Sequence, residues 1–174
     1  YNRYDDLTVC IKSILQQSRL PDELIIIDDA QLPHVPLQAE CEQRGIKVVY
    51  DKKDHPGLTA SRNRGIALAT GELLYFLDDD VELFPQYLEN IARVFDQDKA
   101  GEIGGVGGVI VNDPPLTRSK KIRRLFDLCF MITGPVEGKV LPSGFCVNFG
   151  ASGKAFDGLT AVDFLAGGVC AYRR

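Results

Sequence analysis

The sequence predicts an α/β fold in which a mostly parallel sheet is flanked by helices. Short, continuous apolar runs at 24–27 and 73–77 are typical of parallel strands that are covered on both faces. Segments with helical spacing of apolar residues alternate with these runs at short intervals, as expected for βαβ units. The 174 residues are enough for one domain with a sizeable core.

The elements of the first 55 residues follow from local patterns. A first helix is predicted from a cap at Asp5 or Asp6 to about residue 15, because apolar residues recur there at helical spacing. The strand at 24–27 comes next, then a weaker helix at 36–44 that Gly45 ends, and then a strand at 46–50.

The next elements are marked by glycine, proline and apolar spacing. A helix is predicted at 57–69, and Gly71 separates it from the strand at 73–77. Another helix opens at Pro85, and a glycine-rich strand follows at 103–111. The residues expected on the buried sides of these two helices are Ala60, Ile66, Ala67 and Leu68 in the first and Leu88, Ile91, Ala92 and Phe95 in the second.

The sequence pattern changes after residue 111. Short strands are predicted at 139–141, 145–149 and 161–164, which would form a smaller mixed β region at the C-terminal end. Before them, residues 118–131 combine a basic cluster with apolar residues. This segment leaves open a peripheral contact with an anionic membrane, but a solvated helix whose apolar side packs on the core is the preferred interpretation.

The composition and charge of the chain argue against several classes of function. The net charge of −4 gives no support to nucleic-acid binding, which usually needs a basic surface. No apolar run approaches the roughly 20 residues of a membrane helix. The five cysteines are odd in number and widely spaced, which argues against a zinc site and a disulfide framework. We therefore expect a cytoplasmic protein, with association at the cytoplasmic face of a membrane left open.

The most informative motif is the triplet Asp78-Asp79-Asp80, directly after the apolar run at 73–77. Three adjacent carboxylates repel one another, and burying them unpaired would be very costly. A divalent cation with a phosphate on its far side would resolve this, because Mg²⁺ and Mn²⁺ prefer oxygen ligands. The alternative is a solvated acidic loop that caps the following helix, where acidic residues are favourable.

Several further motifs occur in a specific order. They are Tyr1-Asn2-Arg3, Ser13-Ile14-Leu15-Gln16-Gln17, Ile25-Ile26-Ile27-Asp28-Asp29, Ala60-Ser61-Arg62-Asn63-Arg64-Gly65 and Gly71-Glu72 before the triplet. Together they resemble the family 2 glycosyltransferases of the GT-A fold, which is Rossmann-like and moves a sugar from a nucleoside diphosphate donor. The resemblance implies one partial domain over 1–174. Its nucleotide-sugar-binding half would be 1–111, and 112–174 would begin the acceptor-side half.

The resemblance implies roles at the carboxyl ends of the strands, where ligands bind in such folds. Asp28 and Asp29 match the position that accepts a hydrogen bond from the donor base, although a turn or helix cap is the alternative for both. Tyr1 falls where the family contacts the base by stacking or through its main chain.

The triplet matches the family's D-x-D motif. Asp80 is the expected direct ligand of Mn²⁺ or Mg²⁺, and Asp78 and Asp79 would hold the ribose, or the metal through water. The metal ligands that the resemblance implies are therefore Asp80 and Asp78. Arg62 would pair with a cluster aspartate or a phosphate, and a structural ion pair is the equal alternative.

The donor class implied is a UDP-, GDP- or dTDP-sugar, and the acceptor is a glycan, a lipid-linked molecule or another hydroxyl compound. In the family a strand precedes the position of Tyr1, and inverting members carry an acidic base at a position expected beyond Arg174. No catalytic base is therefore named, and this chain alone is expected to be incomplete for catalysis. Asp163 is the nearest carboxylate and does not match the base position.

Three other interpretations were weighed. A nucleotidyltransferase of similar fold usually has a glycine-rich basic loop after its first strand, and Tyr1-Asn2-Arg3-Tyr4 stands there instead. The intact triplet argues against an inactive nucleotide-sugar-binding module, but this alternative stays open. The glycines at 104–108 lack the phosphate-loop pattern and are expected to lie in a strand.

Overall fold

The computed structural model describes residues 3–29, 32–111, 123, 126–128, 134, 136–144, 146–147, 158–165 and 167–174. The chain forms two compact units, Tyr1–Val106 with Gly168–Arg174, and Gly107–Gly167. We refer to them as the first and the second unit.

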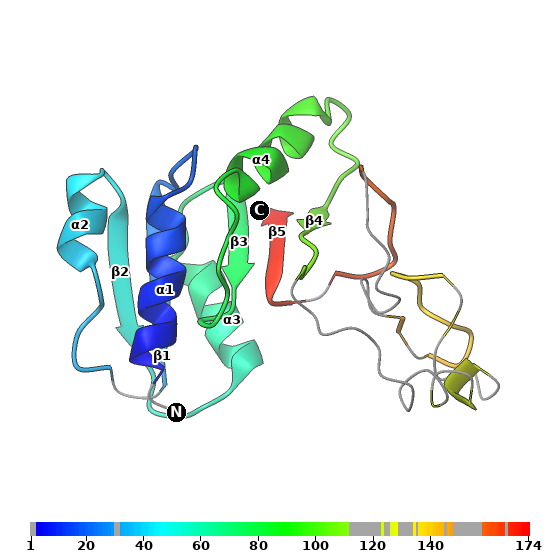
Figure 1. The fold of residues 1–174 in the computed structure, drawn as a ribbon, viewed down its shortest axis with the longest axis horizontal. Coiled ribbons are helices and arrows are strands. Elements are labelled where there is room, and N and C mark those ends of the chain that lie inside the picture. Colours follow the sequence, from blue (N-terminus) through cyan, green and yellow to red (C-terminus); the bar gives the residue numbers. More distant parts are fainter. Residues whose placement is uncertain are drawn as a thin grey trace. The chain divides into compact units, whose positions relative to one another are not determined.

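The first unit holds nearly all of the regular structure (Figure 1). Its elements in chain order are α1 (Tyr4–Leu15), β1 (Glu23–Asp28), α2 (Gln38–Gln43), β2 (Lys47–Lys52), α3 (Leu58–Leu68), β3 (Leu73–Leu77), α4 (Tyr87–Gln97), β4 (Gly105–Gly107) and β5 (Val169–Arg173). The predicted α/β fold is confirmed, and the strand at 73–77 has the predicted bounds.

The strands form two sheets. β1 and β2 pair in parallel, from Glu23 opposite Lys47 to Asp28 opposite Lys52. The other sheet has the order β3-β5-β4, and β3 and β5 pair antiparallel. The strands thus include one parallel pair, β1 with β2, and one antiparallel pair, β3 with β5, so the sheet is less uniformly parallel than expected.

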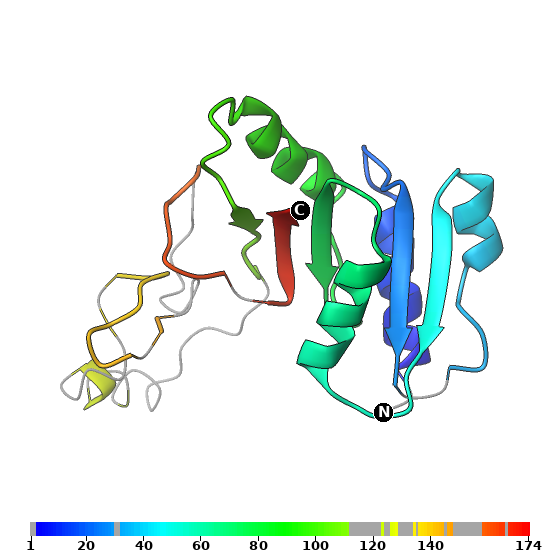
Figure 2. The same ribbon diagram turned by 180° about the vertical axis from the view of Figure 1, so that it is seen from behind.

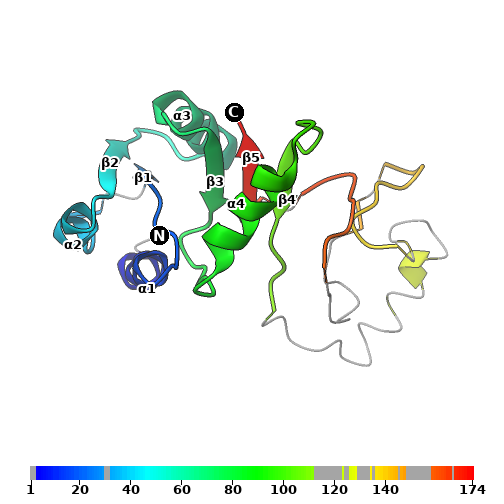
Figure 3. The same cartoon turned by 90° about the horizontal axis from the view of Figure 1, so that it is seen from above.

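Helices cover both faces of the strands in the first unit. α1 lies in front of β1 in Figure 1, and α3 comes to the front in Figure 2, where the molecule is seen from behind. The view from above places the two helices on opposite sides of β1 and β3 (Figure 3). The arrowheads of β1, β2 and β3 point to the same end in Figure 2. The carboxyl ends of these strands therefore share one edge.

The core follows from the amphipathic helices. In α4, the predicted stripe of Leu88, Ile91, Ala92 and Phe95 is buried, and in α1 the buried residues are Cys10, Ile11, Ser13, Ile14 and Leu15. α1 starts at Tyr4 with Arg3 at the N-cap and without a side-chain cap, so the cap predicted at Asp5 or Asp6 is wrong. Both aspartates instead lie in the first turn, where the helix dipole favours negative charge.

Two further expectations are corrected, and one strand had not been predicted. α3 buries none of its residues, and Ile66 and Leu68 are 40% and 36% exposed. The strand expected at 103–111 is only β4, because a glycine-rich segment offers few side chains to pack. The sequence patterns gave no sign of β5, whose antiparallel partner β3 lies far away in the sequence.

The second unit contains an antiparallel bridge between Val140 and Cys146. This agrees with a small β region, although the strand expected at 161–164 is absent from the described residues there. Most of the basic segment 118–131 lies outside the described residues, apart from helical residues at 123 and 126–128. The prediction of a membrane contact through it therefore stays untested.

No helix in the described part of the chain has the length and apolar character needed to cross a membrane. Cys10, Cys41 and Cys170 are buried free thiols, and Cys146 is an exposed one. Burial raises the pKa of Cys10 to about 11, with the charges of Asp79 and Asp80 adding to the effect. Cys10 therefore stays a neutral thiol at pH 7 and packs as a small apolar residue, as the sequence predicts.

Candidate functional site

The aspartate triplet follows the last residue of β3, as predicted. The side chains of Asp78, Asp79 and Asp80 are 47%, 45% and 52% exposed, so water and small ligands can reach all three. The backbone N–H of Asp78 donates a hydrogen bond of 3.0 Å to the carbonyl oxygen of Gly168, immediately before β5. The chain at the start of β5 thereby fixes where the triplet begins.

Each carboxylate of the triplet faces an arginine. Nη1 of Arg3 lies 2.9 Å from Oδ1 of Asp79 and 2.9 Å from Oδ2 of Asp80. Nη2 of Arg62, on α3, lies 3.7 Å from Oδ1 of Asp78. The three negative charges of the triplet are therefore partly offset by two guanidinium groups, one at the N-cap of α1 and one on α3.

Arg3 is the functional candidate that sequence reasoning missed. In the sequence it belongs to the Tyr1-Asn2-Arg3 motif, for which no separate role of Arg3 was predicted. The charge of Asp79 raises the pKa of Arg3, with the hydrogen bond from Arg3 to Asp79 and the charge of Asp80 adding to it. The one available signal was a basic residue just before the first helix, at the edge where the acidic triplet was expected.

Arg62 lies beside the aspartate triplet. The structure brings it to a cluster aspartate, which was one of its two predicted partners. A third of its side chain is exposed, so the guanidinium also remains accessible from solvent.

The two aspartates at the end of β1 have different environments. Asp28 is only 5% exposed, and its Oδ2 accepts hydrogen bonds from the hydroxyl of Tyr50 at 2.6 Å and from the backbone N–H of Leu32 at 2.7 Å. Asp29 is 38% exposed at its side chain and lies 4.0 Å from Nζ of Lys53. Asp28 thus holds the turn after β1, and Asp29 offers the more accessible carboxylate.

We predict that Tyr50→Phe lowers the free energy of unfolding by about 1 kcal/mol, because a buried carboxylate loses a hydrogen-bond donor. Urea unfolding followed by circular dichroism measures the change. Tyr4→Phe is the matched control, because its hydroxyl bonds to His34 at the exposed surface and its loss is expected to matter less. Equal stability of Tyr50→Phe and the unchanged protein would show that the hydroxyl does not support Asp28.

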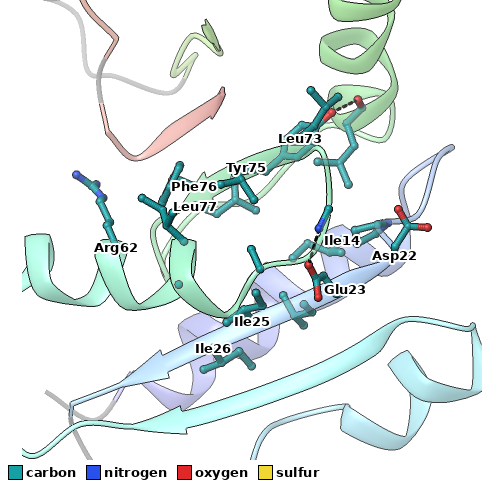
Figure 4. Close-up of a pocket in the computed structure, with 18 of the residues that line it drawn as sticks. Ile14, Asp22, Glu23, Ile25, Ile26, Arg62, Leu73, Tyr75, Phe76 and Leu77 are labelled. Carbon is teal, nitrogen blue, oxygen red and sulfur yellow. Dashed lines mark hydrogen bonds between the residues drawn. The ribbon is translucent and has the colours of Figure 1, made fainter. Parts of the chain in front are cut away.

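A groove of about 1420 Å³ runs between β1 and β3 in the first unit. Aliphatic and aromatic side chains line most of it, including Ile25, Ile26 and Tyr75 in Figure 4. Arg62, Asp29, Asp78 and Asp79 also line the groove. Figure 4 shows Arg62 at one end, away from Asp22 and Glu23. The end that Arg62, Asp78 and Asp79 line is suited to a charged ligand, and the apolar middle of the groove is not.

Two residues named from the sequence remain: the predicted site residue Tyr1, and Asp163, the carboxylate that does not match the base position. Tyr1 is not among the described residues. In the second unit, Asp163 accepts hydrogen bonds from Nζ of Lys139 at 2.7 Å and from the backbone N–H of Val140 at 3.1 Å. The bond from Lys139 is the main cause that lowers the pKa of Asp163, which makes this carboxylate a weaker base.

The carboxylate oxygens of the triplet partly meet the requirements of a site for a hard divalent cation. Carboxylate oxygens are the ligands that Mg²⁺ and Mn²⁺ prefer, and those of the triplet are accessible. Within the described residues, however, no group of three acidic, cysteine or histidine side chains converges to hold an ion by itself. Mg²⁺ is commonly bound by one or two carboxylates with substrate phosphates and water, and the triplet suits that mode.

The fold and the positions of the carboxylates together indicate the class of protein. In open α/β sheets, ligands bind outside the carboxyl ends of the strands, and here Asp29 and the triplet follow β1 and β3. The model of the family described as glycosyl transferase family 2 matches residues 1–158. The chain therefore belongs to glycosyl transferase family 2, which confirms the family expected from the sequence motifs.

Individual relatives agree with the family. The chain is 34% identical over 93 residues to the uncharacterized glycosyltransferase YwdF of Bacillus subtilis, covering 53% of this chain and 34% of that protein. It is 32% identical over 92 residues to the uncharacterized glycosyltransferase YibD of Escherichia coli, covering 52% and 27%. It is 26% identical over 112 residues to the glucosyl-dolichyl phosphate glucuronosyltransferase of Haloferax volcanii, covering 64% and 35%. The chain thus spans about a third or less of each relative.

Proposed function

We propose that this chain is the donor-binding part of a glycosyltransferase that moves a sugar from a nucleoside-diphosphate sugar to an acceptor hydroxyl. The observation that carries the proposal is the accessible triplet Asp78–Asp80 at the carboxyl end of β3, in a chain of glycosyl transferase family 2. Asp29, at the carboxyl end of β1, supports it because both groups lie at the same edge of the strands.

Each residue has a proposed task at this edge. Asp80 and Asp78 would hold Mn²⁺ or Mg²⁺, which when bound stabilises the charge that grows on the departing diphosphate. Asp79, with Asp78, would position the ribose through its hydroxyl groups. Arg62 would remain beside Asp78 and limit the repulsion within the triplet.

The base of the donor would be recognised at the end of β1. Asp29 is the proposed acceptor of a ring N–H, which uracil, thymine and guanine all carry. Asp28 supports it from the buried side through its bonds to Tyr50 and Leu32. Tyr1 is proposed to contact the base, as the family resemblance implies. UDP-, GDP- and dTDP-sugars all meet these requirements.

The reaction is proposed to be inverting, with an acceptor hydroxyl attacking the anomeric carbon as the diphosphate leaves. A carboxylate base would take the proton of that hydroxyl. The lowered pKa of Asp163 makes that residue poorly suited to the task. Glycan and lipid-linked acceptors are both compatible with the proposal, and the Haloferax relative is named for transfer to a lipid-linked sugar. Family membership weighs against the nucleotidyltransferase interpretation.

Calorimetric titration of UDP, GDP and dTDP, each with Mn²⁺ and with EDTA, tests the proposal. We expect one or more of the diphosphates to bind in Mn²⁺ and to bind much more weakly in EDTA, because the metal bridges carboxylates and phosphates. Failure of all three to bind a sample that is folded by circular dichroism would contradict it. Equal binding in EDTA would contradict the role of the metal alone.

A further inference from the structure

Arg3 holds two carboxylates of the triplet through one nitrogen atom. Nη1 lies 2.9 Å from an oxygen of Asp79 and 2.9 Å from an oxygen of Asp80. The guanidinium therefore occupies space that a metal ion bound to the same oxygen of Asp80 would need.

The ion pairs of Arg3 with Asp79 and Asp80 are exposed to solvent, so another cation can replace the guanidinium. The side chain of Arg3 is 44% exposed, and those of Asp79 and Asp80 are 45% and 52% exposed. Ion pairs of this exposure are weak in water, so the guanidinium can leave without a large cost. A divalent cation carries twice the charge of the guanidinium and prefers the same oxygen ligands.

We propose that Arg3 is an internal counter-ion that pairs with Asp79 and competes with the divalent cation for Asp80, and so sets the metal affinity of the site. In the free protein it limits the repulsion among the carboxylates, and it must swing away when the metal binds. This inference rests on the proposed metal-binding function of the triplet. Binding to a state that is only partly populated weakens the apparent affinity in proportion, so removing the competitor raises it.

The test is direct titration of Mn²⁺ alone, with the unbound ion counted by electron paramagnetic resonance. We expect Arg3→Gln to bind Mn²⁺ about three- to tenfold more tightly than the unchanged protein, the range that one or two exposed ion pairs allow. Arg3→Lys keeps the charge and is expected to stay near the original affinity. The gain from Arg3→Gln should shrink at high salt, because salt screens exposed charges.

Two further variants separate the possible outcomes. Arg93→Gln removes an exposed arginine that pairs with Glu89 on α4, and it should leave Mn²⁺ binding unchanged. Asp80→Asn should remove the binding. If Arg3→Gln binds Mn²⁺ no more tightly while Asp80→Asn still abolishes binding, the counter-ion role is wrong and the metal site stands. If neither the unchanged protein nor any variant binds Mn²⁺ alone, the counter-ion role is wrong, and the titration of diphosphates with Mn²⁺ then decides whether the metal site stands.

A second readout does not depend on metal affinity. Without metal, Arg3→Gln should melt at a lower temperature than Arg3→Lys, because the three carboxylates lose a counter-ion. Added Mn²⁺ should then raise the melting temperature of Arg3→Gln more than that of the unchanged protein, since tighter binding to the folded state stabilises it more. Equal shifts in the two proteins would contradict the proposal.

Discussion

Replacing Asp80 with asparagine is expected to abolish metal-dependent binding of the donor nucleotide. Asparagine keeps the size of the side chain but removes its charge, so the metal loses a proposed carboxylate ligand. Loss of an outer-shell partner alone costs 10–100-fold in metal affinity. We therefore expect loss of a direct ligand to weaken Mn²⁺-dependent nucleotide binding by about 100-fold or more. Calorimetry with the diphosphate that binds best measures the change.

Asp96→Asn is the matched control for this experiment. Asp96 lies on α4, its side chain is 72% exposed, and its contact with Arg19 is 3.9 Å long. Its replacement should leave nucleotide binding unchanged. An Asp80→Asn variant that binds the nucleotide as tightly as the unchanged protein, with the same dependence on Mn²⁺, would remove Asp80 from the site.

Replacing Gly168 with alanine is expected to weaken nucleotide binding by about tenfold, a cost typical of a partner that orients a metal ligand. A Cβ atom on Gly168 would lie 2.5 Å from Oδ2 and 3.2 Å from Cγ of Asp78, so the Asp78 carboxylate must turn away. Its exposed position lets it move at little cost, so we expect the free energy of unfolding to change by less than about 1 kcal/mol. Calorimetry and urea unfolding of the same sample give the two values.

Gly104→Ala provides the comparison. A Cβ atom there meets no heavy atom within 4 Å, and neither Gly104 nor Gly168 has a φ that disfavours alanine. Gly104→Ala should therefore keep both stability and affinity. If Gly168→Ala binds the nucleotide normally, the orientation of Asp78 has no part in donor binding. If it unfolds outright, the close contact is structural.

The sequence predicted those structural elements that depend on residues close together along the chain. The run Leu73–Leu77 is bounded by a turn on one side and by charged residues on the other, so its bounds were visible in the sequence. The stripe of α4 was visible because its apolar residues recur at helical spacing. The triplet was expected at the carboxyl end of a strand and is found there.

Long-range pairing could not be predicted in this way. β5 owes its place to the register of Val169–Arg173 against β3, and nothing near β5 in the sequence shows that partner. A continuous sheet would need another strand between β1 and β3, and the described residues supply none there. The division into two sheets was therefore not visible in the local sequence patterns.

The directions in which individual side chains point also could not be predicted from the sequence. Successive residues of an extended chain point to opposite faces, so Asp28 and Asp29 differ in environment, but the sequence does not say which of them is buried. The structure shows that Asp28 is bonded to Tyr50 and Leu32. The role of Arg3 was likewise invisible, because an arginine before a helix has no pattern that identifies its partner.

The central claim is that Mn²⁺ and a nucleoside diphosphate bind together at the carboxyl end of β3. The most direct measurement is the paramagnetic broadening of backbone amide signals in nuclear magnetic resonance spectra, with Mn²⁺ and the diphosphate added in small amounts. The account predicts that the signals of Asp79, Asp80 and Gly168 broaden first, and that those of Gly45 and Gly101 remain sharp. Uniform broadening, or broadening centred away from the triplet, would contradict it.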